Sequence, residues 1–261
     1  MKQQCIIVMP EGPIIAIFKE RLKALHVEGK AITKVTGITE IASQKLLHAG
    51  LIEIKSWGKH LLLCFEQFTI RIHLMMSGAY TINRLPNGSE DISLTFDSQI
   101  VNIYSASLVY ITRNLEEIYD WSADIMSPSW NPEAALRKLI KKPATFICDA
   151  ILDQSVFAGA GNIIKNEALF RSKVHPLSRI GAVPKPKLRE IIDEVRNYSF
   201  DFYRWKKERT LIQRWLAYSK ETCPRCHIPM VKMETGKTKR LDYFCVSCQC
   251  LYKVAQSELE F

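Results

Sequence analysis

Two pairs of cysteines near the C-terminal end constrain the fold of this 261-residue chain more than any other feature. Both pairs have the spacing Cys-x2-Cys: Cys223 and Cys226 form the first, Cys245 and Cys248 the second, and residues 227–244 separate them. Each pair can form a tight turn that aims two thiolates at one tetrahedral metal, and the spacer is long enough for a β-hairpin. The spacing therefore predicts one structural zinc ion held by these four cysteines.

Two neighbouring side chains leave the ligand set open. His227 follows the first pair and Cys250 follows the second, and either could replace a neighbouring cysteine. The isolated cysteines, each among apolar neighbours, are expected to be buried thiols: Cys5, Cys64 and Cys148.

The location of the other five cysteines in one short segment indicates metal binding in a reducing compartment. No apolar run approaches the roughly 18 residues of a membrane span. We therefore expect a cytoplasmic protein without a membrane partner.

The charge of the chain favours a polyanionic partner. Lys and Arg outnumber Asp and Glu by 36 to 27, which gives a net charge of +9. The excess is concentrated between Trp205 and Arg240, where ten basic residues stand against three acidic ones. A basic zinc hairpin too small to fold alone is typical of a DNA or RNA contact element, although a solvated basic face would have the same composition.

The first half of the chain has the pattern of an antiparallel β-structure behind one helix. Residues 13–26 carry apolar side chains at helical spacing behind a proline, which predicts an amphipathic helix. Short β-like runs then alternate with turn signals, which suits an antiparallel sandwich or barrel. These runs are residues 31–35, 51–55, 60–65, 68–74, 79–82, 92–96 and 99–104.

After about residue 125 the pattern becomes helical. Asn131 and Pro132 have the sequence of a helix start, and the helix is predicted to run to Lys142. Further helices are predicted at residues 143–152, 161–172 and 186–205. We therefore predict an α+β protein with a β-sandwich domain (1–125), a helical domain (126–215) and a zinc finger (216–261).

Four segments in this order resemble the formamidopyrimidine-DNA glycosylase and endonuclease VIII family, over nearly the whole chain. They are Met9-Pro10-Glu11-Gly12-Pro13, the turn Trp57-Gly58-Lys59, the stretch from Asp153 to Asn162 that precedes a helix, and Arg240 five residues before Cys245. The stretch ending at Asn162 is similar to the family's helix–two-turn–helix motif. The resemblance implies a bifunctional DNA glycosylase and abasic-site lyase in base excision repair.

The resemblance also implies a role for individual residues. Pro10 would be the nucleophile, because a free N-terminal proline is a secondary amine that can form an iminium with the sugar. Glu11 would be the acid for base removal, and Lys59 would supply a positive charge near the sugar or phosphate. Alternatively, Pro10 and Glu11 could belong to an ordinary helix start and Lys59 to a plain turn.

Other matched positions imply contacts with damaged double-stranded DNA by a monomer. Asn162 would hold a phosphate beside the lesion, and Arg240 would contact DNA from the finger. Met75 and Met76 match the residues that fill the space left by a flipped nucleotide. Asn162 could also be a helix N-cap, which is compatible with a phosphate contact, and the two methionines could instead be core residues. Asp124 and Glu167 also lie in matched segments but receive no role.

One departure concerns the nucleophile. The nitrogen of Pro10 is an amide in the chain as written, and an amide cannot form an iminium. Because N-terminal processing removes a methionine that precedes proline, we expect Met9 to be the true start and residues 1–8 to be absent. If residues 1–8 are retained, the same scaffold would be a non-catalytic damaged-DNA-binding module.

Two further departures concern the substrate. The family often has a second glutamate three residues after Glu11, where this chain has Ile14, so the resemblance supports abasic-site cleavage more strongly than base removal. Residues 104–107, Tyr-Ser-Ala-Ser, resemble the endonuclease VIII branch, and residues 108–112 lack the Arg-Phe pair of the formamidopyrimidine branch. We therefore expect oxidised pyrimidines to be the favoured substrates.

Overall fold

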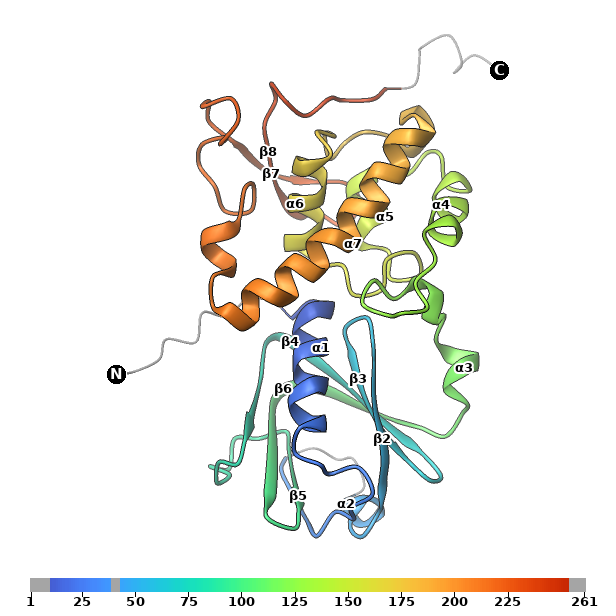
Figure 1. Ribbon diagram of the computed structural model, residues 1–261, viewed down its shortest axis with the longest axis vertical. Helices are drawn as coiled ribbons and strands as arrows, with labels where there is room; N and C mark the ends of the chain where they lie inside the picture. The colour runs from blue at the N-terminus through green and yellow to red at the C-terminus, as the bar shows by residue number, and fades with distance from the viewer. Residues whose placement is uncertain (1–9, 39–42, 254–261) are drawn as a thin grey trace. The chain divides into compact units, whose positions relative to one another are not determined.

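The computed structural model describes residues 10–38 and 43–253, so Cys5 and Met9 lie outside the described residues. The chain divides into two compact units, Met1–Tyr119 and Asp120–Phe261, and each is described here by itself (Figure 1). In the described part of the chain, no helix combines the length and apolar character that crossing a membrane would require. The division of the second unit into a helical domain and a finger stays a prediction.

Helix α1 (Gly12–Lys23) confirms the amphipathic helix expected at the start of the first unit. Pro13 lies in its first turn, where the missing N–H has no intrahelical acceptor to lose. Ile15, Phe18 and Leu22 recur at helical spacing and are buried. The helix thereby turns one apolar face toward the strands (Figure 1).

In the part of the first unit that the structure describes, the strands form one six-stranded sheet in the order β1-β5-β6-β4-β3-β2, and every neighbouring pair is antiparallel. The short helix α2 (Ser43–Leu46) precedes β2, and α3 (Leu115–Ile118) follows β6. The strands are β1 (Lys34–Thr36), β2 (Leu51–Trp57), β3 (His60–Phe65), β4 (Thr69–Ile82), β5 (Ile92–Phe96) and β6 (Gln99–Ile111).

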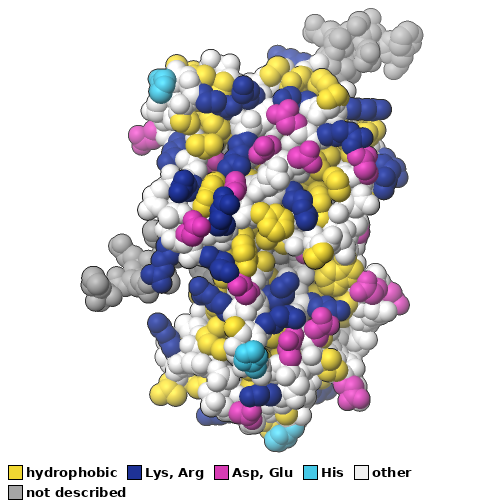
Figure 2. Space-filling model, in the orientation of Figure 1, with side chains coloured by type: hydrophobic (Ala, Val, Ile, Leu, Met, Phe, Trp, Pro, Cys, Tyr) yellow, Lys and Arg dark blue, Asp and Glu magenta, His cyan; other side chains and the backbone are white. Residues whose placement is uncertain are grey.

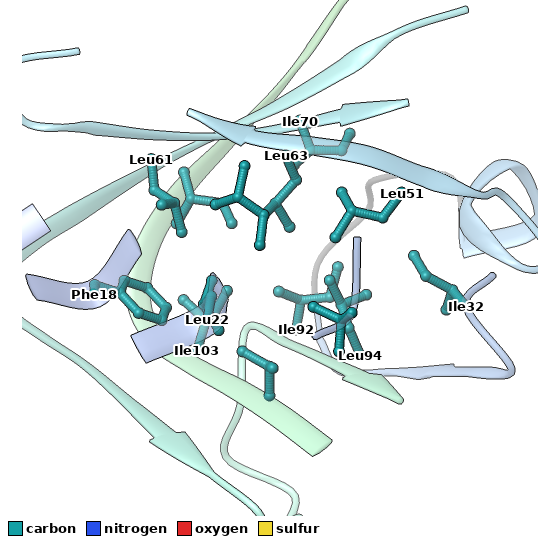
Figure 3. Close-up of a cluster of buried hydrophobic side chains, with 14 of the residues drawn as sticks. Phe18, Leu22, Ile32, Leu51, Leu61, Leu63, Ile70, Ile92, Leu94 and Ile103 are labelled. Carbon is teal, nitrogen blue, oxygen red and sulfur yellow. The ribbon is translucent and has the colours of Figure 1, made fainter. Parts of the chain in front are cut away.

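The long strands β4 and β6 explain how a single sheet encloses a core. The first part of β4 pairs with β3, and the first part of β6 pairs with β5. Figure 3 shows Leu61 and Leu63 of β3 facing Ile92 of β5 and Ile103 of β6 across the core. The two ends of the sheet therefore cover the same apolar cluster, as in a sandwich.

The second unit is built around helix α6, whose residues Asn162–Phe170 are all buried. The long helix α7 packs against α6 and α4 (Figure 1). Asn131 caps α4 as predicted, because its Oδ1 accepts the backbone N–H of Ala134 at 3.0 Å. The helices are α4 (Pro132–Ile140), α5 (Ile147–Leu152), α6 (Asn162–Arg171) and α7 (Lys185–Glu208), with single 3-10 turns at Trp121–Ala123, Ile180–Ala182 and Leu211–Arg214.

The predicted hairpin between the cysteine pairs is present, with β7 (Val231–Thr235) antiparallel to β8 (Arg240–Phe244). Other predicted bounds differ. Residues 68–74 and 79–82 belong to one strand, β4, which is interrupted by a bulge between Leu74 and Ala79. β6 extends to Ile111, β1 is shorter than predicted, and α5 begins at Ile147, because residues 143–145 turn and Phe146 forms an isolated bridge with Arg179.

Candidate functional site

The N-terminal end of α1 fixes the first candidate pair, Pro10 and Glu11. Pro10 is half-buried, whereas Glu11 is 1% exposed. Glu11 occupies the N-cap position with an extended backbone, and its carbonyl oxygen accepts the N–H of Ile14 at 2.9 Å. Ile14 itself is half-buried in the first turn. A buried carboxyl group therefore follows directly on Pro10 at a rigid position.

Lys59 lies in the two-residue turn between β2 and β3. The preceding Gly58 has a φ of +54°, a left-handed conformation that glycine adopts without a steric cost. The ring of His73 lies behind the turn, with Nδ1 3.2 Å from the carbonyl oxygen of Lys59. Because a carbonyl only accepts, Nδ1 carries the hydrogen and donates it, which holds the backbone of Lys59 in place.

Beside this turn, aromatic rings and His73 surround the ring of His60. His60 pairs with His73 across β3 and β4, and the rings of Trp57 and Tyr119 lie within 5.8 Å of the His60 ring. Burial, with help from the charge of Arg71, lowers the pKa of His60 to about 4. Burial also lowers the pKa of His73. Lys59 therefore stands beside two imidazoles that are neutral at pH 7.

The bulge in β4 presents Met75 and Met76 to solvent, with 50% and 63% of their surfaces exposed. The core alternative for these methionines is therefore wrong. Gly78 closes the bulge so tightly that an added Cβ would lie 2.7 Å from the side chain of Leu74. A larger residue at position 78 would force the bulge open, so the glycine fixes how the two methionines project.

The opposite strand is also shaped around this bulge. Leu74 pairs with Ala106 and Ala79 with Tyr104, so Ser105 faces the bulged residues. Ser105 has a φ of +49°, which is uncommon for a residue other than glycine. The carboxylate of Asp91 accepts the N–H of Ala106 at 2.6 Å and holds this segment in place.

In the second unit, the four predicted cysteine ligands come together. The Sγ atoms of Cys223, Cys226, Cys245 and Cys248 all lie within 4.8 Å of one another, and those of Cys223 and Cys248 are 3.8 Å apart. A tetrahedron of sulfur atoms about 2.3 Å from zinc has edges of about 3.8 Å. The four thiolates therefore fit a closed zinc site without an open coordination position.

The two alternative ligands lie outside this group. Among the described residues, the cluster that could hold a metal contains neither His227 nor Cys250, and both side chains are exposed. The backbone of Cys250 has another role, because its carbonyl oxygen accepts the N–H of His175 at 2.9 Å. Cys148 is buried, as expected for an isolated thiol, whereas Cys64 is only half-buried.

Asn162 is the first residue of α6 rather than its N-cap, which is Gly161. The N-cap alternative for Asn162 is therefore wrong. Its Nδ2 donates to the carbonyl oxygen of Leu241 at 2.9 Å, so the side chain ties α6 to the hairpin. Its Oδ1 accepts no hydrogen bond from the residues that the structure describes.

Arg240 begins β8 and is exposed. Its neighbours in the hairpin are held by buried polar groups of α6. Lys165 Nζ lies 2.9 Å from the carboxylate of Asp242, and both side chains are 1% exposed. Asn166 accepts the N–H of Tyr243 at 2.6 Å. Burial raises the pKa of Asp242, and the ammonium of Lys165 acts in the opposite direction.

The two matched acids without a role are structural in this fold. Glu167 is completely buried, and its carboxylate accepts the backbone N–H groups of Leu216, Ala217 and Tyr218 at 2.8–3.1 Å. Burial raises the pKa of Glu167, although these N–H groups lower it. Asp124 is 2% exposed and its Oδ1 accepts the N–H of Met126 at 2.9 Å. Glu167 thereby anchors the segment that leads into the finger.

The candidate residues thus belong to two sets. Pro10, Glu11, Lys59 and the two exposed methionines lie in the first unit; Asn162, Arg240 and the cysteines lie in the second. On the face drawn in Figure 2, Lys and Arg side chains are interleaved with acidic ones, so this face has no patch of a single sign. The net charge alone therefore does not identify a DNA-binding surface.

Comparison with known proteins agrees with both units. Residues 9–107 match the family model described as the formamidopyrimidine-DNA glycosylase N-terminal domain, and residues 123–198 match the H2TH domain of the same glycosylase. Endonuclease 8-like 3 of Bos taurus is 30% identical over 214 residues, which cover 77% of this chain and 34% of that protein. The chain spans about a third to a half of the length of the Endonuclease 8-like 3 relatives.

Other relatives match from end to end. The protein named DNA-(apurinic or apyrimidinic site) lyase Nei2 of Mycolicibacterium smegmatis is 28% identical, over 92% of this chain and 99% of its own. The crystal structure of Lactococcus lactis formamidopyrimidine-DNA glycosylase with DNA containing an AP site has a TM-score of 0.80 at 18% identity, over 92% and 99% of the two chains. Together with the two domain matches, these similarities show that the chain belongs to the formamidopyrimidine-DNA glycosylase and endonuclease VIII family.

Proposed function

We propose that this protein is a bifunctional DNA glycosylase and abasic-site lyase of base excision repair, acting as a monomer on damaged double-stranded DNA. The observation that carries the proposal is the position of Pro10 directly before the buried Glu11 at the start of α1. The name of the Nei2 relative, which is an abasic-site lyase, and the AP-site DNA in the Lactococcus lactis structure support it.

The reaction begins at the nitrogen of Pro10, once processing has freed it. An α-amino group is partly unprotonated at neutral pH and can act as a nucleophile. The lone pair forms a bond with C1′ of the damaged nucleoside, and the bond from C1′ to the base breaks. Opening of the sugar ring gives an iminium, which acidifies the 2′ hydrogens. Loss of a 2′ proton then expels the 3′ phosphate, and a second elimination expels the 5′ phosphate.

Glu11 and Lys59 assist the first of these steps. The carboxyl group of Glu11 is shielded from water and adjoins the nucleophile, which suits it to deliver a proton to the sugar oxygen or the departing base. Lys59 lies on a turn held by His73 and flanked by neutral imidazoles, so its ammonium is the positive charge that this turn offers to the sugar or phosphate.

The remaining candidates hold the DNA. Met75 and Met76 project from a rigid bulge and are suited to fill the space that a flipped nucleotide leaves. We propose that Arg240 contacts a phosphate and that the start of α6, with Asn162, binds a second one. The zinc ion would be held by Cys223, Cys226, Cys245 and Cys248 and would stabilise the hairpin that carries Arg240.

The favoured substrates in this proposal are oxidised pyrimidines. The support is the sequence Tyr-Ser-Ala-Ser at residues 104–107 and the absence of an Arg-Phe pair in residues 108–112. A comparison of excision rates for a duplex with an oxidised thymine and a duplex with 8-oxoguanine opposite cytosine tests this part. Faster removal of 8-oxoguanine would contradict the preference and leave the lyase chemistry untouched.

Covalent trapping tests the nucleophile. Borohydride reduces an iminium to a stable amine, so a protein that begins at Pro10 should be trapped on abasic DNA. The full 261-residue chain should bind the same DNA without being trapped, because its Pro10 nitrogen is acylated. Glu11→Gln in the protein that begins at Pro10 should still be trapped on an abasic site but should not release an intact damaged base.

Peptide mapping of the adduct decides between the alternatives. If the full-length chain is trapped as efficiently as the shortened one, and the adduct maps to Lys59, then Pro10 is not the nucleophile. If both forms bind damaged DNA and neither is trapped or cuts it, the scaffold is a damaged-DNA-binding module without lyase activity.

A further inference from the structure

The turn of the β7–β8 hairpin is held from outside by one carboxylate, that of Asp149 in the first turn of α5. Its Oδ2 accepts the backbone N–H of Lys237 at 2.9 Å. Its Oδ1 accepts the N–H of Thr238 at 3.0 Å and the hydroxyl of Thr238 at 2.9 Å. Three hydrogen bonds to one ionised group fix the backbone of the turn on α5.

Gly236 shows how closely this carboxylate approaches the turn. A Cβ at position 236 would lie 2.5 Å from Oδ1 and 2.6 Å from Oδ2 of Asp149. Gly236 also has a φ of +67°, which a residue with a side chain rarely adopts. Because Gly236 has no side chain, the carboxylate of Asp149 can reach the backbone of the turn.

The strand after the turn is held independently by α6. Asn162 donates to the carbonyl oxygen of Leu241, Lys165 forms an ion pair with Asp242, and Asn166 accepts the N–H of Tyr243. Three consecutive residues of β8 therefore have buried partners on one helix. Arg240, the exposed first residue of β8, and the exposed Lys239 lie between these three residues and the turn held by Asp149.

We propose that Asp149 is a positioning residue for DNA binding, which fixes the backbone from which Arg240 reaches a phosphate. The inference rests on the proposed function, because it requires Arg240 to contact DNA. A side chain carried on a backbone that is ordered in advance loses less conformational freedom on binding than one on a mobile turn. Asp149 thus favours DNA binding although its own charge repels the phosphates.

The positioning role and the charge of Asp149 have opposite effects on DNA affinity, so a substitution that removes the charge tests the role. Removing an acid from a DNA-binding protein ordinarily strengthens binding, because the net charge becomes more positive. Asp149→Asn should instead weaken binding. The asparagine amide has one oxygen that can accept an N–H of the turn, but its NH2 group cannot accept the other. The matched control is Asp193→Asn, which changes the net charge equally at an exposed residue of α7.

The experiment measures binding of the full-length chain to a duplex with a tetrahydrofuran analogue of an abasic site, across a range of salt concentrations. Arg240→Ala should lose affinity about tenfold, the scale of a hydrogen bond to a charged group, and should reduce the salt slope by about 0.9. Asp149→Asn should lose between about threefold and tenfold relative to Asp193→Asn. The double variant of Asp149 and Arg240 should bind no more weakly than Arg240→Ala alone.

Hydrogen exchange provides a readout that does not involve DNA. The amide protons of Lys237 and Thr238 should exchange faster in Asp149→Asn, while the zinc content and the protection of the Tyr243 amide stay unchanged. Asp149→Glu, which keeps the carboxylate, should recover part of the affinity.

Each other result overturns the inference. If Arg240→Ala weakens binding but Asp149→Asn binds like Asp193→Asn, the positioning role is wrong and the proposed DNA contact stands. If the losses of the two single variants add in the double variant, Asp149 acts through another group. If Arg240→Ala binds with unchanged affinity and salt slope, the proposed contact and the positioning role fail together.

Discussion

The buried ion pair between Lys165 and Asp242 allows a quantitative test of how the second unit is stabilised. Its two side chains are 1% exposed, and the charged atoms are 2.9 Å apart. Lys165→Met removes the cation and leaves the carboxylate buried, where the hydroxyl of Thr235 still donates a hydrogen bond to it. Leaving one member of such a pair unpaired costs about 3–5 kcal/mol. We therefore expect Lys165→Met to lower the free energy of unfolding by that amount.

The double variant Lys165→Met with Asp242→Leu separates pairing from packing. With no charge left at this ion pair, it should recover most of the lost stability, apart from about 1 kcal/mol for the Thr235 hydroxyl, which keeps only the weak acceptor Cys148 Sγ. Urea denaturation followed by circular dichroism gives the free energies, and hydrogen exchange of the Tyr243 amide reports the hairpin itself. Lys185→Met, at an exposed lysine at the start of α7, is the matched control and should change stability by less than about 0.5 kcal/mol.

Two outcomes would refute this reasoning. A loss of less than about 1 kcal/mol in Lys165→Met would mean that water or a rearranged side chain compensates the carboxylate. A double variant that loses the sum of both single changes would mean that packing, rather than charge pairing, determines the cost.

Two further predictions concern the metal and the pH dependence. The purified protein should contain one zinc per chain by elemental analysis. Cys245→Ser should lose the metal, the hydrogen-exchange protection of the hairpin amides and DNA affinity, while the sheet of the first unit stays folded. Metal-free protein that binds DNA at full affinity would contradict this. Burial lowers the pKa of His60 from its ordinary value near 6.5 to about 4. As the pH falls through this interval, the unfolded chain binds a proton that the folded first unit does not. The stability of this unit should therefore decline from pH 6.5 toward 4, and His60→Phe should show a flatter pH profile in urea titrations; identical profiles would remove His60 as the cause.

Local sequence patterns predict the bounds of a strand correctly where its pairing is regular along its whole length. β3 and β5 have the predicted bounds, because their apolar runs are bounded by turn residues. β4 was predicted as two strands, because Met75 and Met76 and the residues after them interrupt the pattern. These methionines lie in the bulge and are exposed, so the pattern failed where the chain departs from regular pairing.

In the candidate site, too, residues with partners nearby in the sequence were predicted, and residues with distant partners were not. The cysteine ligands could be predicted because each pair lies within one turn of the chain. Asp149 and Lys165 were missed, because their partners lie far away in the sequence and no local pattern connects them. A weak signal was present: Asn162, Lys165 and Asn166 are polar residues at helical spacing in a helix that is otherwise apolar or small on that face.

The burial of α6 also has a consequence for the order in which the protein folds during synthesis. The hydrogen bonds from α5 and α6 to the hairpin join residues 75–89 positions apart. At the speed of translation, roughly 4–18 s pass between the synthesis of the helices and that of their partners. During this time the polar groups of α6 remain in water, and the core of the second unit is incomplete. The second unit can therefore complete its fold only after β8 has emerged from the ribosome.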